Sequence, residues 1–225
     1  MSLREKYLHT REQIASACAR SGRHPESVNL IAVSKTHPVA LVDEVAGFGQ
    51  VHFGENRIAE LAEKKSSATV PGLQWHLIGQ LQTNKVKQLE ADTILHTLDR
   101  ISLADKLQAR FADTTIRCLL QVNCSGEPNK SGVDPSEFEA LVDYVAQKPA
   151  IRVLGLMTMA ENTEDEGRIR AAFARLRQLS EQVKDRGVFP GYAGWLSMGM
   201  SGDFELAIAE GATHVRVGSA IFGHR

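Results

Sequence analysis

The most constraining feature of this sequence is an alternation of two patterns along the chain. Short runs rich in β-forming residues recur eight times, over residues 28–35, 50–54, 73–79, 93–99, 116–124, 151–159, 194–199 and 213–219. Segments with helical spacing lie between them, over residues 39–47, 55–65, 80–90, 100–111, 135–147, 163–186 and 202–210. Strands that alternate with helices are typical of a parallel sheet covered by helices.

Two architectures satisfy this alternation: a doubly wound open sheet and a (β/α)8 barrel. An open nucleotide-binding sheet would carry a glycine-rich turn directly after its first strand, and the segment "SKTHPVA" has no glycine. We therefore favour the barrel. Residues 1–20 alternate apolar and charged residues and predict an extra amphipathic helix. Composition shows no break, so we expect a single domain over residues 1–225.

Composition excludes several classes of protein. The chain has 26 basic and 27 acidic residues, with a net charge of −1, so no global field favours nucleic acid or a membrane surface. The first residues form no apolar core of a signal peptide. Cys18, Cys118 and Cys124 are odd in number and form no CxxC pair, which favours a reducing cytoplasm. The histidines form no HExxH motif, so we expect no metal site.

Three local signals predict where helices begin or end. Asp99 is placed to cap the segment that follows it. Asp134 and Pro135 form an N-cap followed by a proline in the first helical turn. Gly187 follows two basic residues, as expected after the last turn of a helix.

The first strand runs directly into a lysine, in "LIAVSKTHP". Active sites of barrels lie at the carboxyl ends of their strands, where Lys35 is expected. A lysine held in a desolvated site or near another cation loses its proton more readily and can attack a carbonyl. The alternative is a strand-end lysine that extends into water.

The last two strands are followed by segments rich in small residues, "LSMGMSGDFELAI" and "VRVGSAIFG". Small residues allow backbone N–H groups to approach an anion, and each segment opens a predicted helix. The loops after strands seven and eight of a barrel often bind phosphate. The alternative is that these glycines only form tight turns. An amine and a phosphate site on one barrel mouth would suit a phosphorylated carbonyl compound, either pyridoxal phosphate or a sugar phosphate.

Seven stretches, in order, resemble the pyridoxal phosphate homeostasis protein family. They are "AVSKTHP", "FGENRIAE", "WHLIGQLQTNK", "QVNCSGEPNKSGV", "GLMTMA", "LSMGMSGDFELAI" and "RVGSAIFG". This resemblance covers the chain from about residue 30 to its end. It implies the barrel fold of the alanine racemase N-terminal domain.

The resemblance also implies residue roles, with pyridoxal 5′-phosphate (PLP) as the cofactor. Lys35 would be the lysine that forms a Schiff base with it. Ser201, Gly218 and Ser219 would hold the phosphate, and Asn56 would line the site.

Arg216 would face the pyridine nitrogen of the cofactor. A guanidinium only donates hydrogen bonds, so it favours an unprotonated ring nitrogen. The ring is then a weaker electron sink than one that faces a carboxylate, which disfavours carbanion chemistry.

The residues needed for racemisation are not where a racemase would have them. The chain has Val39 four residues after its lysine, where a racemase of this fold has a tyrosine, and Met159 where it has a histidine. Tyr7, Tyr144 and Tyr192 are not at predicted strand ends. The chain ends at Arg225, directly after the last motif, so we expect no second domain. We expect a PLP-binding protein without robust catalysis.

The remaining expectations concern partners and rival functions. The implied role is to hold PLP reversibly in the cytoplasm, as a monomer, with transfer to apo-enzymes that use PLP. The rivals are a PLP-dependent amino-acid racemase and a Schiff-base aldolase acting on sugar phosphates. Lys130 is either a second amine for the cofactor or a loop lysine in water. His37 and His76 are either neighbours of the cofactor or packing and capping residues.

Overall fold

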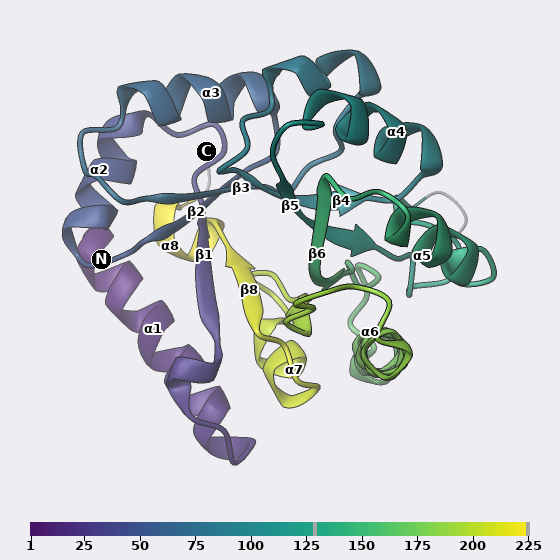
Figure 1. Ribbon diagram of the computed structural model, residues 1–225. Helices are drawn as coiled ribbons and strands as arrows, with labels where there is room; N and C mark the ends of the chain where they lie inside the picture. The colour runs from purple at the N-terminus through teal and green to yellow at the C-terminus, as the bar shows by residue number, and fades with distance from the viewer. Residues whose placement is uncertain (128–129, 224–225) are drawn as a thin grey trace.

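The computed structural model describes residues 1–127 and 130–223, in which eight parallel strands close into a barrel (Figure 1). The strands follow one another around the barrel in chain order, and the last pairs with the first. They are β1 (Asn29–Val33), β2 (His52–Glu55), β3 (Gln74–Leu77), β4 (Ile94–Leu98), β5 (Ile116–Gln121), β6 (Ile151–Met157), β7 (Trp195–Ser197) and β8 (His214–Val217). The predicted barrel is confirmed, and the open sheet is excluded.

Helices form the outer layer. They are α1 (Leu3–Arg20), α2 (Val39–Gly47), α3 (Ile58–Ser67), α4 (Ile101–Arg110), α5 (Phe138–Ala146), α6 (Glu166–Arg186), α7 (Phe204–Ala209) and α8 (Ser219–Phe222). Two 3-10 helices, η1 (Pro25–Ser27) and η2 (Thr83–Gln88), complete the secondary structure. The segment 80–90 forms a 3-10 turn rather than the expected α-helix.

The predicted leading helix is present as α1. Ser2 caps it in a reciprocal capping box with Glu5, which satisfies two backbone donors at the helix start. Its apolar face buries Tyr7 and Ile14, and the helix packs against α7 and α8. Figure 1 shows α1 beside the seam where the first and last strands meet.

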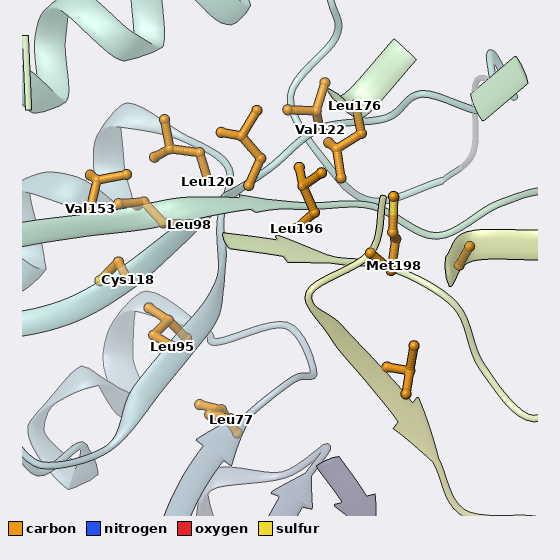
Figure 2. Packing of buried hydrophobic residues seen from close by; sticks show 14 of the residues in the cluster. Leu77, Leu95, Leu98, Cys118, Leu120, Val122, Val153, Leu176, Leu196 and Met198 are labelled. Carbon is orange, nitrogen blue, oxygen red and sulfur yellow. The ribbon is translucent and has the colours of Figure 1, made fainter. Parts of the chain in front are cut away.

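The main core lies between the strands and the surrounding helices. Leu77, Leu95, Leu98 and Leu120 are among its fully buried members, and Figure 2 shows them with other buried side chains on neighbouring strands. The close approach of β6 and β7 requires Gly155, because a Cβ there would lie 2.0 Å from the main-chain oxygen of Trp195.

Helix boundaries agree with the sequence signals in one case and differ in two. Gly187 ends α6 in the left-handed conformation (φ 62°), as predicted. Asp99 does not cap α4; it forms an ion pair with Arg100, the residue at the N-cap. Asp134 instead accepts hydrogen bonds from Ser136 in a turn, and α5 begins only at Phe138. In both cases a local side-chain contact replaces the cap.

Three further observations concern the described residues. Cys18, Cys118 and Cys124 are buried free thiols. No described helix combines the length and the apolar character that crossing a membrane requires. No group of three or more potential metal ligands occurs in residues 1–127 and 130–223.

Candidate functional site

A pocket of about 470 Å³ opens at the carboxyl ends of the barrel strands. All six residues to which the sequence assigns a binding role line it: Lys35, Asn56, Ser201, Arg216, Gly218 and Ser219. A hollow of about 510 Å³ lies beside it against α2 and α3. We place the candidate site in the first of these because it gathers residues from several strand ends, as active sites of barrels do.

The pocket exists because the two ends of the sheet meet. Lys35 follows β1, and Gly218 and Ser219 follow β8, which pairs with β1 in parallel. Gly218 permits close contact at this seam, since a Cβ there would lie 3.0 Å from the main-chain oxygen of Val33. Residues that are more than 180 positions apart in the sequence therefore share one wall of the pocket.

Lys35 lies at this wall but is exposed, so the burial that the sequence argument invoked is not found. The residue after it, Thr36, has a φ of 69°, a conformation that non-glycine residues rarely adopt. Its backbone N–H donates to the carboxylate of Glu60. The turn that carries the lysine is thus held in an unusual backbone conformation by a specific contact.

A buried ion-pair cluster lies directly behind this turn. The Nζ atom of Lys64 donates to the main-chain oxygen of Ser34 (2.6 Å), to Glu55 Oε1 (2.7 Å) and to Glu60 Oε1 (2.8 Å). Ser34 Oγ donates to Glu55 Oε1 as well (2.6 Å). Burial raises the pKa of Glu55, and its bonds to Lys64 and Ser34 oppose that rise. The cluster fixes the backbone on both sides of Lys35.

Arg216 is the buried cation of the pocket. Its side chain points inward from β8, and the residue is 3% exposed. Nη1 donates to Ser197 Oγ (2.7 Å) and Nη2 to the main-chain oxygen of Thr158 (3.0 Å). Burial lowers the pKa of Arg216 to about 10, and Asp203 partly opposes this at longer range. The guanidinium therefore stays charged at neutral pH, held by two neutral acceptors.

The loop after β7 offers unused backbone donors. Among the described residues, no protein acceptor is recorded for the backbone N–H groups of Ser201 and Gly202. Gly199 shapes this loop with a φ of 91°, and a Cβ there would lie 2.9 Å from the Cα of Phe204. A loop that presents free N–H groups near Lys35 and Arg216 can accept an anion.

The rest of the lining is apolar or uncharged. Met157, Met159 and Met200 contribute flexible apolar surface, and Met157 is fully buried. No carboxylate, histidine or tyrosine is found among the described residues that line the pocket. The electrostatic field of the pocket is therefore positive and suits a ligand that combines a flat apolar body with an anionic group.

Lys130 lies in a neighbouring cavity of about 430 Å³, which shares Met159, Met200 and Gly202 with the first. Its amine donates to the main-chain oxygen of Ala160 (2.9 Å) and pairs with Glu127 (2.7 Å). These contacts fit a structural lysine, and capture of a second cofactor by this amine stays a prediction. The motif that contains it also includes Pro128 and Asn129, which lie outside the described residues.

Sequence reasoning missed the histidines beneath the pocket. His76 does not reach the mouth; it is fully buried inside the barrel and contacts the rings of His52 and His96. His37 packs against Phe222, with ring centroids 5.3 Å apart. Four histidines lie on barrel strands: His52 on β2, His76 on β3, His96 on β4 and His214 on β8. Their places inside predicted strands were the one signal that could have grouped them.

The chain is similar in sequence to a known protein family. The family model described as "Alanine racemase, N-terminal domain" matches residues 10–225. The chain is 40% identical over 228 residues to the pyridoxal phosphate homeostasis protein of Aquifex aeolicus, covering 100% of this chain and 99% of that one.

Solved structures give the same picture. PipY of Synechococcus elongatus, in a structure with PLP bound, is 37% identical and superposes with a TM-score of 0.81, covering 95% of this chain and 99% of that one. Alanine racemase from Corynebacterium glutamicum, 20% identical with a TM-score of 0.70, shares the fold over 96% of this chain and 60% of that one. The chain therefore belongs to the pyridoxal phosphate homeostasis protein family, whose barrel is that of the alanine racemase N-terminal domain.

Proposed function

We propose that this protein binds PLP reversibly, through a Schiff base with Lys35, and takes part in the homeostasis of intracellular vitamin B6. The observation that carries the proposal is the pocket itself, which combines an amine, a buried guanidinium and free backbone N–H groups on one barrel mouth. The PLP-bound structure of PipY and the names of the curated relatives support the same ligand.

The residues fit the three chemical parts of the ligand. Lys35 supplies the amine for the aldehyde. The loops that contain Ser201 and Ser219 present hydroxyl and backbone donors to the phosphate, and Gly218 allows the phosphate to approach the backbone. Asn56 lines the same pocket and would contact the ring or its substituents.

Arg216 suits the pyridine nitrogen because Ser197 and Thr158 accept only two of its hydrogen bonds, so further N–H donors are available for a ligand. A donor that stays charged at neutral pH keeps the ring nitrogen unprotonated. When bound, PLP supplies an electrophilic aldehyde and an electron-withdrawing ring, and this contact weakens the second property. The pocket therefore favours retention of the cofactor over carbanion chemistry.

We further propose that the protein lacks robust catalysis. A two-base racemase needs an acid or base on each face of its substrate. Met159 lines the pocket. Tyr144 on α5 bonds Asp105, and Tyr192, in the loop before β7, bonds Ser180 on α6. Apart from Lys35 and Arg216, the described residues that line the pocket are apolar or uncharged, so no second acid or base faces the amine of Lys35.

The test of binding is spectroscopic. The purified protein incubated with PLP should develop visible-edge absorbance, which borohydride should convert into a stable adduct on the peptide that contains Lys35. Lys35→Ala should abolish both signals, and Lys130→Ala serves as the matched lysine control. An adduct confined to another lysine, or absorbance that survives Lys35→Ala, would refute the assignment.

Two measurements separate this function from its rivals. A racemase would exchange the α-deuterium of labelled amino acids at ordinary catalytic rates, whereas we expect no turnover on that scale. A sugar-phosphate aldolase would be trapped by borohydride only together with its sugar substrate, and would not retain PLP.

The wider setting is also proposed. We infer a single binding domain over residues 1–225 that acts as a cytoplasmic monomer and passes PLP to apo-enzymes. Light scattering should give the mass of one chain. When the PLP-loaded protein is mixed with an apo-aminotransferase, the activity of the aminotransferase should recover faster than the rate at which the loaded protein releases PLP into solution would allow. Reactivation no faster than free release would exclude direct transfer.

A further inference from the structure

A line of imidazole rings crosses the interior of the barrel and ends at Arg216. His52 Nδ1 lies 2.9 Å from His76 Nε2, and His76 Nδ1 lies 2.8 Å from His96 Nε2. His96 Nδ1 lies 2.9 Å from Ser197 Oγ, which is the acceptor for Arg216 Nη1 at 2.7 Å. We call His52, His76, His96 and Ser197 the histidine relay.

The chemistry of the last member indicates one direction for the hydrogen bonds of the relay. A guanidinium only donates, so Ser197 Oγ accepts from Arg216. The oxygen could also accept from His96, but the buried hydroxyl proton would then have no acceptor among the described residues, so we take Ser197 to donate to His96 Nδ1. A neutral ring that accepts at Nδ1 carries its proton on Nε2, so His96 donates to His76, and His76 donates in turn to His52.

This arrangement requires neutral rings, and the surroundings provide that condition. Burial lowers the pKa of His76 and of His96 well below the usual value for histidine, and the charge of Arg216 adds to the effect on His96. Burial lowers the pKa of the nearby His214 to about 3. The charged groups around the relay are Arg216, Arg117 near His52, and Asp203 near Arg216.

Arg216 is therefore a permanent positive charge at one end of the histidine relay, whose rings are neutral and whose hydrogen bonds all run in one direction. Because its pKa of about 10 keeps it protonated near neutral pH, the relay does not conduct protons through it. The relay can instead orient the hydroxyl group of Ser197. Ser197 would otherwise be free to rotate its hydroxyl, and it is 0% exposed, so bulk solvent does not reach this contact.

We propose that the histidine relay is a positioning device for Arg216: it holds the hydroxyl of Ser197 as an acceptor, so that the remaining guanidinium donors face the pocket and recognise the lone pair of a pyridine nitrogen. The proposal rests on the proposed function for its ligand. Its geometric part concerns the protein alone. His52, His76 and His96 are positioning residues, because none of them lines the pocket among the described residues.

The first experiment tests the relay without any ligand. Imidazole ¹⁵N spectra of the ligand-free protein at pH 7.5 should show neutral rings protonated at Nε2 for His76 and His96. Ser197→Ala should move the Nδ1 resonance of His96 to the position of a free acceptor. Protonation of either ring at Nδ1, or a cationic ring, would overturn the proposal.

The second experiment tests recognition with two ligands: PLP and its analogue in which carbon replaces the ring nitrogen. Ser197→Ala should weaken PLP binding by about tenfold, the loss expected when a bond to a charged group is removed, and should barely change binding of the analogue. Ser197→Thr, which keeps the hydroxyl, should retain the preference for PLP. The matched control is Ser180→Ala, which removes a buried hydroxyl on α6 that bonds Tyr192.

The outcomes are distinguishable. Equal losses for both ligands in Ser197→Ala, or no loss for either, would refute a positioning role, since a general defect of the fold does not discriminate between the ring atoms. If Ser197→Ala does not fold, the tautomers of the unmodified protein still decide the geometry. Failure of the unmodified protein to bind either ligand would overturn the proposed function and the recognition role with it, while the spectra would judge the relay separately.

Discussion

Acidification should begin to destabilise this barrel near pH 6.5, above the pH range in which carboxylates become protonated and ordinary acid unfolding begins. His76, His96 and His214 are at most 1% exposed, and burial lowers the pKa of each below the histidine value of about 6.5 that the unfolded chain retains. Below that pH the unfolded chain binds more protons than the folded one. The free energy of unfolding is therefore greatest above pH 6.5 and falls as the pH decreases toward the folded pKa values.

The magnitude follows from proton linkage. At pH 5.5 each fully buried histidine should lower the free energy of unfolding by about 1.4 kcal/mol, so the three together should lower it by roughly 4 kcal/mol. His52 is half-buried and is left out of this sum because solvent screens it. Burial raises the pKa of Glu55 and Asp203, which acts in the opposite direction and reduces the net loss of stability. The free energy of unfolding of a typical domain is about 5–15 kcal/mol in total, so this loss is a large fraction of it.

Urea unfolding of the ligand-free protein, followed by far-ultraviolet circular dichroism at pH 7.5, 6.5, 5.5 and 5.0, measures this dependence. His96→Gln should reduce the slope below pH 6.5 by about 1.4 kcal/mol per pH unit, the contribution of one proton. His9→Gln, on the exposed face of α1, controls for the loss of a histidine as such. A free energy of unfolding that is constant between pH 7.5 and 5.5 would refute the reasoning.

The other predictions concern single sites. Lys64→Met should cost about 3–5 kcal/mol of stability in urea unfolding because it leaves the carboxylate of Glu55 buried without a cation; adding Glu55→Gln should recover much of this, and an additive double variant would argue against the ion pair. Gly155→Ala should destabilise the barrel by more than about 1 kcal/mol, since the new Cβ overlaps the main chain of Trp195; a neutral effect would mean that the strands can separate there. Ser201→Ala should raise the Kd for PLP roughly tenfold in equilibrium titration, and unchanged affinity would contradict the phosphate assignment.

The architecture could be predicted because the signals for it are local. Most strands and helices show their own periodicity, and the eight strands follow the expected order, although segment 80–90 forms a 3-10 helix where an α-helix was expected. The failures have a common physical cause, since competing short-range contacts decide where a helix starts. Asp99 pairs with Arg100, and Asp134 closes a turn with Ser136, so neither carboxylate caps the helix that follows.

The pocket lining was predictable for a different reason. Lys35, Arg216 and Ser219 follow from strand ends and from motifs, and the barrel brings strand ends together by topology. The histidine relay was not predictable in this way. His76 and His96 are twenty residues apart on neighbouring strands, and their contact depends on the inward-facing register inside the closed barrel.

The pairing of β1 with β8 also means that the two sides of the pocket wall are synthesised at different times. During translation the segment with Lys35 leaves the ribosome long before the segment with Ser219, yet the wall of the pocket needs both. A nascent chain that has not yet formed β8 therefore presents Lys35 without Gly218 and Ser219 beside it. This wall of the pocket is accordingly complete only after β8 has paired with β1 and closed the barrel.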